Sequence, residues 1–407
     1  MTPSAKEHSG QDDDGTSQWR STLVVMFIAQ LFSIVGFSFV LPFLPFYIRE
    51  IGVTDEKLVP VWAGILGAAS SLAMTIFAPI WGWLSDRYGR KLMVERAMFA
   101  GAVITMSMGA VGNVYQLLIL CLITGAFAGT ISASISLVSA VLPVMKLGFG
   151  LGLMQVAVFL GMSLGPLIGG IIADMVGYRL TFVAGGAVLL VGGILVMLGV
   201  TEKFIRPSVT SLRRSGSMWT LIALPGFVSL MLVFLLFNFS IHIAIPILPL
   251  FIEAVGNLKT RVASTTGLMF AVTGATAAIS AAAIGYLSDR MGHKRVLIVN
   301  LFITSILWVA HAMARNIDQL LIIRILFGFA AGGNLPTMNA IVGKLTTKES
   351  YGKAYGLMAS MTSLGMTLGP LAGGIMASHM GLRSPFVVVG LLLSLVLIPI
   401  IARLKAG

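Results

Sequence analysis

Long, uninterrupted runs of apolar residues are the feature that most restricts how this chain can fold. A helix that spans a bilayer needs about 20 predominantly apolar residues, whereas membrane β-strands alternate apolar and polar residues over about ten. The composition fits the helical alternative, because 57% of the residues are hydrophobic and only 10% are charged. We predict an all-α membrane protein with twelve transmembrane helices, at roughly residues 22–48, 60–83, 93–112, 116–142, 148–174, 180–200, 225–251, 263–287, 296–314, 319–343, 354–378 and 385–402.

The positive charges predict how these helices are oriented. The net charge of +12 comes mainly from Lys and Arg in the even-numbered loops and at the two ends of the chain. Such an excess marks the cytoplasmic side of a membrane protein, so we expect both termini in the cytoplasm and no binding of nucleic acid. Residues 1–21 are polar and lack the features of a signal peptide, and we expect them to form a disordered cytoplasmic tail.

Several segments recur along the chain at a constant offset of 203 or 204 residues. The repeat predicts two six-helix halves, residues 22–200 and 225–407, joined by a cytoplasmic linker at 201–224. Because six is an even number, both halves cross the membrane in the same sense and are related by a pseudo-twofold axis along its normal. The matching pairs are VLPFLPFYIREIG (40–52) with AIPILPLFIEAVG (244–256), QLLILCLITGAFAG (116–129) with QLLIIRILFGFAAG (319–332), and SLGPLIGGIIADMVGYRLTF (163–182) with TLGPLAGGIMASHMGLRSPF (367–386).

Two motifs connect this plan to a known family. GWLSDRYGRK (82–91) lies between the second and third predicted helices and recurs as GYLSDRMGHK (285–294), while GMSLGPLIGG (161–170) lies in the fifth predicted helix. With them the chain resembles the major facilitator superfamily over nearly its whole length, and within it the 12-helix drug:proton antiporter family of bacterial multidrug exporters. The resemblance implies the major facilitator fold, a location in the bacterial cytoplasmic membrane, and a substrate site between the halves near mid-membrane.

The first motif gathers charges at the predicted cytoplasmic edge. A carboxylate there can accept hydrogen bonds from Arg or face the positive end of a helix in the other half, and each contact is worth about 1 kcal/mol. The resemblance implies the same role, a latch that holds the outward-facing state. The alternative is a loop that only fixes orientation. We predict the latch residues to be Gly82, Asp86, Arg87, Gly89, Arg90 and Lys91, with Asp289, Arg290 and Gly292 as a weaker second copy.

The second motif combines small residues with a proline inside a helix. Glycines four residues apart share one helix face and let two helix backbones approach closely, while proline removes one backbone hydrogen bond and bends the helix. We expect both copies to seal the outer half of the pathway, and the resemblance to antiporters points to export. The residues are Gly161, Gly165, Pro166, Gly169 and Gly170, and in the second copy Gly369, Pro370 and Gly373.

The chain departs from the resembling family at the position associated with proton transfer. Where the fourth helix usually carries Arg in the pattern R-x-x-x-G, this chain has Cys121, and only the second copy keeps Arg324. The first predicted helix also lacks an acidic residue within its span. Asp86 and His242 are therefore our candidates for proton coupling, the latter because histidine titrates near neutral pH. His311 and His379 are assigned no role.

Substrate contacts are expected from the helices that the fold would place around a central cavity. Aromatic, amide and methionine side chains offer an adaptable surface for lipophilic guests, although the same residue types commonly serve as packing. A buried histidine is likewise often a packing residue. The predicted cavity residues are Gln30, Phe37, Gln155, Phe234, Asn238, His242, Arg324, Asn334 and Asn339. Pro42, Pro45, Pro246 and Pro249 predict bends near the outer ends of the first and seventh helices.

Together these features predict a monomeric exporter of lipophilic or amphipathic small molecules that works by alternating access in exchange for protons. The alternative is a facilitator or symporter that imports a small, anionic metabolite, which suits the isolated Arg324. A receptor or scaffold would call for a larger soluble part than residues 1–21. We find no metal-ligand spacing, nucleophile motif or phosphate-binding loop, and therefore expect no enzymatic activity, cofactor or metal.

Overall fold

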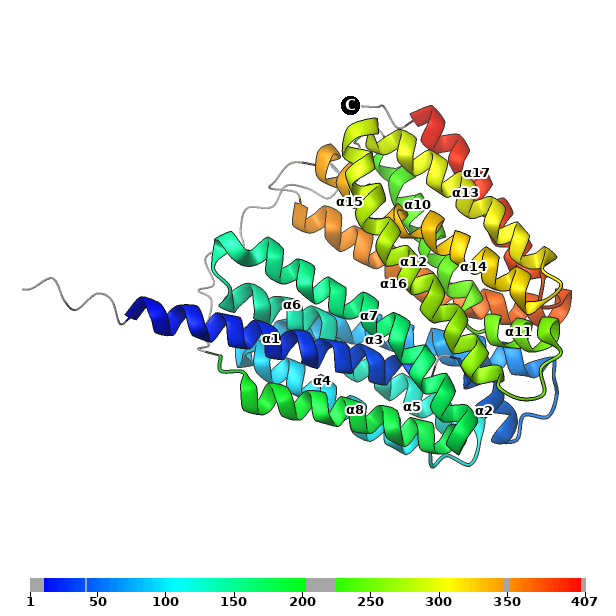
Figure 1. Cartoon of the computed structure of the whole chain (residues 1–407), viewed down its shortest axis with the longest axis horizontal. Helices are drawn as coiled ribbons and strands as arrows, with labels where there is room; N and C mark the ends of the chain where they lie inside the picture. Colours follow the sequence, from blue (N-terminus) through cyan, green and yellow to red (C-terminus); the bar gives the residue numbers. More distant parts are fainter. Residues whose placement is uncertain (1–10, 41, 203–223, 225, 347–350, 404–407) are drawn as a thin grey trace, which may run out of the picture.

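The computed structural model describes residues 11–40, 42–202, 224, 226–346 and 351–403, and its regular structure there is helical (Figure 1). The elements are α1 (Gln11–Ser38), α2 (Leu44–Glu50), α3 (Leu58–Tyr88), α4 (Arg90–Met108), α5 (Val114–Phe127), α6 (Thr130–Val141), the short 3₁₀ turn η1 (Val144–Lys146), α7 (Leu147–Val176), α8 (Tyr178–Gly199), α10 (Phe227–Ala244), α11 (Leu248–Gly256), α12 (Val262–Met291), α13 (His293–Met313), α14 (Ile317–Gly332), α15 (Asn334–Leu345), α16 (Tyr351–Met380) and α17 (Ser384–Arg403).

Nine helical segments among the described residues are long and apolar enough to cross a membrane, which makes the chain a multi-pass membrane protein. The other three predicted spans also lie on helices. These three helices are not among the nine for different reasons. Helix α4 has too many charged residues in its first two turns, and the glycines, serines and threonines of α16 lower its mean hydropathy. The apolar part of α17 is too short. All twelve predicted apolar runs therefore coincide with helices.

The helices gather into two groups, an N-terminal group (α1–α8) and a C-terminal group (α10–α17) (Figure 1). The groups meet where α2 and α11 lie, which we call the α2–α11 end. They diverge toward the opposite end, where α3 turns into α4 at Gly89 and α12 turns into α13 at Gly292, which we call the Gly89–Gly292 end.

Residues 203 or 204 positions apart make the same contacts in the two groups. Asn113 caps α5 by accepting a hydrogen bond from the N–H of Gln116 at 3.0 Å, and Asn316 caps α14 in the same way at 2.8 Å. The guanidinium of Arg179 donates to the carbonyls of Gly109 and Val111, and that of Arg383 donates to those of Ala312 and Ala314. The sequence repeat is therefore matched by repeated local structure.

Several predicted helices are interrupted, and two of the interruptions were expected. The prolines at 42, 45, 246 and 249 separate α1 from α2 and α10 from α11, as predicted. A break at Ala128 and Gly129 was not predicted. It separates α5 from α6 because Gly129 has a φ of +126°, which a glycine adopts without steric cost. Gly333 separates α14 from α15 at the corresponding point.

The beginning of the chain differs from our expectation. Residues 1–21 were predicted to be disordered, but α1 begins at Gln11. Once the apolar run from Thr22 onward forms a helix, extending it by further turns needs no new nucleus, and this explains the earlier start. Residues 1–10 and most of the predicted linker, 203–223, lie outside the part of the chain that the structure describes.

Candidate functional site

The contact between the two groups is made by long helices that cross at glycines and prolines. On one side α7 crosses α12, where Gly170 abuts the backbone of Ala263 and Gly267 abuts the backbone of Pro166. There is no room for a Cβ atom at either glycine. A larger side chain at either position would hold the two backbones farther apart. The glycines therefore determine how close the two groups lie.

The second crossing repeats the first with the roles of the groups exchanged. Here α3 crosses α16, where Gly374 abuts the backbone of Pro60 and Gly64 abuts the backbone of Pro370. Pro370 and Gly374 are the counterparts of Pro166 and Gly170 in the repeat. Both copies of the glycine–proline motif thus lie at the boundary between the groups, near the α2–α11 end.

The remaining glycines of the motif face their own group. An added Cβ would lie 2.5 Å from Ile34 at Gly161 and 2.7 Å from Ser38 at Gly165, and Gly169 abuts Phe39, so this face packs on α1. In the second copy Gly369 lies against Phe239 and Gly373 against Ile243 of α10. The motif therefore has two faces, one that holds neighbouring helices together within a group and one that meets the other group.

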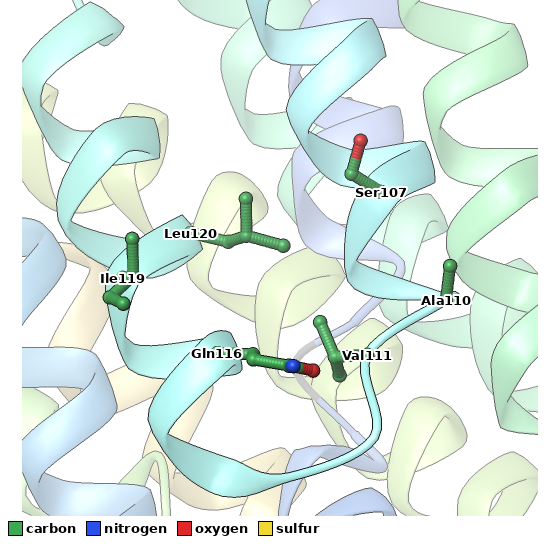
Figure 2. Close-up of a pocket in the computed structure, with 6 residues that line it drawn as sticks. All are labelled: Ser107, Ala110, Val111, Gln116, Ile119 and Leu120. Atoms are coloured by element: carbon green, nitrogen blue, oxygen red, sulfur yellow. The ribbon is translucent and has the colours of Figure 1, made fainter.

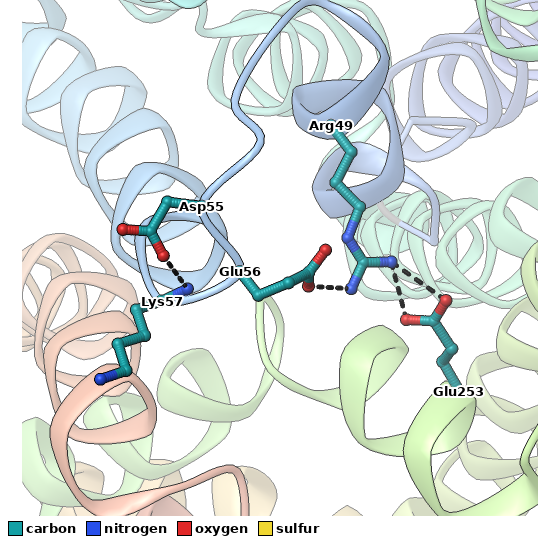
Figure 3. Close-up of polar contacts among 5 residues, drawn as sticks. All are labelled: Arg49, Asp55, Glu56, Lys57 and Glu253. Atoms are coloured by element: carbon teal, nitrogen blue, oxygen red, sulfur yellow. Dashed lines mark hydrogen bonds and ion pairs between the residues drawn. The ribbon is translucent and has the colours of Figure 1, made fainter.

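Polar contacts close the same end of the boundary. One nitrogen of Arg49 in α2 lies 3.0 and 2.8 Å from the two carboxylate oxygens of Glu253 in α11, and its other terminal nitrogen lies 2.6 Å from Glu56 (Figure 3). The carboxylate of Asp174 at the end of α7 accepts a hydrogen bond from the N–H of Ser264 at the start of α12, at 2.8 Å. Both contacts join the N-terminal group to the C-terminal group.

Two opposing effects act on the guanidinium of Arg49, which lies outside the membrane-spanning segments. Burial lowers its pKa, because an ion loses favourable hydration when it is partly covered. The hydrogen bonds and charges of Glu253 and Glu56 raise it by more, so that the pKa lies above its ordinary value. The carboxylates therefore stabilise Arg49 as a cation.

The first charged loop is tied to its own group. Glu202, just after α8, accepts hydrogen bonds from the N–H groups of Arg90 and Lys91 at 3.1 and 2.8 Å. These N–H groups begin α4, so the carboxylate caps that helix. Arg87 lies over the rings of Trp83 and Tyr88. Asp86 lies in α3, and its side chain is outside what the structure describes.

The second charged loop also makes its contacts within its own group. The side chain of Asp289 is 75% exposed and lies 3.7 Å from His293 of the same loop, while Arg290 lies over the ring of Tyr286. An added Cβ at Gly82 or at Gly285 would meet no atom within 4 Å. These contacts stay within each group, in agreement with the separation of the groups at the Gly89–Gly292 end in Figure 1.

The predicted cavity residues divide by exposure. Gln155 and Asn339 are exposed and His242 is partly exposed. Phe37 packs against Gly101 of α4, inside the N-terminal group. The other predicted cavity residues are buried within their groups, and these are Gln30, Phe234, Asn238, Arg324 and Asn334.

Arg324 and His242 differ in their surroundings. Arg324 is 4% exposed, its guanidinium lies 5.8 Å from the ring of Phe327, and its Nε and Nη2 have no hydrogen-bond partner among the described residues. These two nitrogens form the edge that holds acidic groups in bidentate pairs. His242 donates from Nδ1 to the carbonyl of Asn238 at 2.8 Å and packs against Gly369, which leaves Nε2 for another partner.

Sequence reasoning missed a second arginine inside a helix. The guanidinium of Arg96 in α4 lies 3.4 Å from the centre of the Trp81 ring and donates to the carbonyl of Ala128 at 3.5 Å. The indole N–H of Trp81 donates to the carbonyl of Ala126. Both side chains thus satisfy carbonyls at the end of α5, where the helix is broken. Adjacent charges within the apolar run LMVERAMF were the signal that could have indicated it.

Two surface cavities differ in their relation to the boundary. One of about 560 Å³ lies beside the Arg49–Glu253 pair and is lined by residues of both groups. The other, of about 310 Å³, lies at the turn between α4 and α5 (Figure 2). Its lining residues all belong to the N-terminal group, so only the first cavity bears on the contact between groups. The residues that line the second cavity are Ser107, Ala110, Val111, Gln116, Ile119 and Leu120.

A multi-pass helical protein whose two groups touch at one end and separate at the other has the architecture of a membrane transporter. The sequence profile of the Major Facilitator Superfamily matches residues 26–263 and 262–406. The chain therefore belongs to the Major Facilitator Superfamily, a family of transporters rather than enzymes.

Curated relatives and solved structures agree with this assignment. The chain is 30% identical to the multidrug resistance protein MdtG of Klebsiella pneumoniae (strain 342) over 376 residues, 92% of this chain and 91% of that one. It is 31% identical to MdtG of Proteus mirabilis (strain HI4320), covering 91% and 92% of the two chains. A bacterial homologue of the human lysosomal transporter Spinster, solved inward-facing and occupied, superposes with a TM-score of 0.79 at 15% identity, over 93% of this chain and 95% of that chain.

Proposed function

We propose that the chain is a secondary active exporter of lipophilic or amphipathic small molecules, a multidrug efflux transporter, and that it exchanges these molecules for protons. The N-terminal and C-terminal groups are its two six-helix halves, with twelve membrane spans in all. The Gly89–Gly292 end is cytoplasmic, the α2–α11 end is extracytoplasmic, and both termini lie in the cytoplasm of a bacterium. The transporter acts as a monomer.

The observation that carries this proposal is the glycine–proline boundary. The two crossings bring the halves into backbone contact near the α2–α11 end, through the motif that resembles the antiporter motif of multidrug exporters. The match to the MdtG protein of Klebsiella pneumoniae covers 92% of the chain. The positive charges of the loops favour the opposite end as the cytoplasmic one. The structure is then an inward-facing state, closed on the outside.

Export requires a second state in which the outer boundary opens and the cytoplasmic ends approach each other. In that state the loop that contains Asp86 would meet the other half and act as the latch, with Asp289 in the weaker copy. A difference of a few kcal/mol decides which state predominates, so latch contacts of about 1 kcal/mol are sufficient to shift the populations.

Susceptibility of a host that lacks its own efflux pumps tests the proposal. Expression of the wild-type chain should raise the inhibitory concentration of several unrelated lipophilic cations or amphiphiles. Purified protein in liposomes should then release protons to the side from which substrate is removed, detected with a pH-sensitive dye after substrate addition. Transport without proton movement at any pH contradicts antiport, and transport toward the cytoplasm alone contradicts export.

The second candidate function is the import of a small anionic metabolite. Its support is Arg324, a buried cation for which no acidic partner is found among the described residues. An importer would accumulate a labelled organic anion in whole cells, and Arg324→Gln would abolish the accumulation. The exporter proposal predicts no such accumulation.

A further inference from the structure

The ion pair between Arg49 and Glu253 is unusual because of where its two residues lie in the repeat. They are 204 residues apart, which is the offset that relates the two copies. FYIREIG (46–52) aligns with LFIEAVG (250–256), so Arg49 and Glu253 occupy the same position in the two halves. Each residue therefore pairs with its own counterpart.

A residue can reach its own counterpart only close to the axis that relates the two copies. At such a point a repeat with identical charges would place like charges against each other, which is unfavourable. This chain has opposite charges there, while the apolar residues around them remain similar. The pair thus marks the place where the two halves face each other most directly at this end.

We infer that Arg49 and Glu253 form the outer gate of the transporter, an ion pair that must break whenever the halves separate at the α2–α11 end. The inference rests on the proposed alternating access. Arg49 bridges Glu253 of the other half and Glu56 of its own half, so separation leaves it with one partner (Figure 3). The pair favours the inward-facing state because it exists only there.

The surroundings of the pair suit a contact that opens and closes repeatedly. The side chains of Arg49 and Glu253 are 28% and 31% exposed, and the cavity of about 560 Å³ lies beside them. Water can therefore hydrate both charges as they part, which keeps the cost of opening small. A fully buried pair would be expensive to separate and would hold the transporter in one state.

The gate is tested by measuring which state predominates. Cys121, the only cysteine, is replaced by alanine, and spin labels are attached at Tyr115 and Asp318, exposed residues on the two halves near the α2–α11 end. Arg49→Glu places a third carboxylate beside Glu253 and Glu56, the two that Arg49 bridges. We expect the fraction of outward-open protein, read from the longer label distances, to rise roughly tenfold relative to the inward-open fraction.

Two further variants make the result specific. The double exchange Arg49→Glu with Glu253→Arg restores opposite charges and should return the distances to the wild-type distribution. Glu50→Gln removes the ion pair with Arg179, which lies on the same surface but within one half, and should leave the distribution unchanged. If Arg49→Glu does not fold, Glu253→Gln should produce a smaller shift in the same direction.

An unchanged distribution in both Arg49→Glu and Glu253→Gln overturns the gate, and so does a double exchange that stays shifted. The label distances are recorded without substrate. A chain that exports no drug but shows the shift and its restoration therefore contradicts the proposed function and leaves the gate standing.

Discussion

At the scale of single residues, Arg324 poses the clearest energetic question. A charge in a membrane protein interior is costly unless it is paired, and the fork formed by Nε and Nη2 of this guanidinium has no hydrogen-bond partner among the described residues. The guanidinium of Arg383, in the same half, donates to two acceptors, the carbonyls of Ala312 and Ala314. Two arginines in one half thus make opposite contributions to stability.

We therefore expect Arg324→Met to raise the free energy of unfolding by about 1–3 kcal/mol, because it removes an uncompensated charge and keeps an apolar stem. Arg383→Met should lower it by about 1 kcal/mol, since two carbonyls lose their donor. Thermal unfolding of the purified protein in detergent, followed by intrinsic fluorescence, measures both. A destabilised Arg324→Met would mean that the guanidinium has a binding partner in solution.

Residue types in a sequence indicate helices more directly than they indicate which side chains line a cavity. Gln30, Phe234 and Asn334 were selected because amide and aromatic side chains suit a binding surface, but all three are buried within their groups. An apolar membrane helix has no polar face from which its orientation could be deduced, because lipid and helix interior are both apolar. The sequence therefore predicts where the helices lie along the chain but not which of their faces point into their own group.

At the scale of elements, the crossing of α7 and α12 depends on backbone contact at Gly170. Replacing this glycine by alanine forces the helices apart against a backbone that cannot yield, which costs about 1–3 kcal/mol. We expect Gly170→Ala to lower the efflux rate roughly tenfold and to lower the fraction of protein that is closed at the outer end. Gly152 of the same helix is the matched control, because a Cβ there meets no atom within 4 Å.

Both variants, Gly170→Ala and Gly152→Ala, are compared with the wild type by efflux from cells and by the spin-label distances described for the outer gate. Gly152→Ala should behave as the wild type in each measurement. Equal effects of Gly152→Ala and Gly170→Ala would show that helix α7 responds to any added methyl group, and would remove the crossing from the mechanism.

The break between α5 and α6 was not visible in the hydrophobic pattern, since the apolar run continues through it. It is maintained by Arg96 and Trp81, which bond to the carbonyls of Ala128 and Ala126. A cation near the end of a helix and over an indole ring is favourable on both counts. Nε and Nη1 of Arg96 are also buried without a hydrogen-bond partner among the described residues, but the guanidinium lies 3.4 Å from the centre of the Trp81 ring and donates to the carbonyl of Ala128. We therefore expect Arg96→Leu to lower the free energy of unfolding by about 1–2 kcal/mol, measured by thermal unfolding, with Arg315→Leu on the surface as a neutral control.

At the scale of the whole molecule, the repeat was the most informative part of the sequence. It predicted which segments correspond, and the matching contacts of Asn113 with Asn316 and of Arg179 with Arg383 agree with it. The pairing of Arg49 with Glu253 was not predicted, because both residues lie just beyond the ends of the predicted apolar runs 22–48 and 225–251 and were assigned no role. Contacts between distant residues depend on how the two groups meet, and no local pattern encodes that.

The proposed latch and the proposed gate act on opposite ends of one equilibrium, which gives a prediction for the whole transporter. Asp86→Asn weakens closure at the Gly89–Gly292 end and should lower the ratio of outward-open to inward-open protein about fivefold. Asp289→Asn should change it less. Arg49→Glu changes the ratio in the other direction.

Because the two sites lie at opposite ends of the molecule, their effects on the free energy should add. The double variant Asp86→Asn with Arg49→Glu should therefore show a ratio equal to the wild-type ratio multiplied by the two single-variant factors, which returns it toward the wild-type distribution. Spin-label distances at Tyr115 and Asp318 provide all four ratios. An Asp86→Asn protein with wild-type distances and wild-type transport would eliminate the latch, whereas a double variant that follows only one of the singles would mean that the two ends do not share one equilibrium.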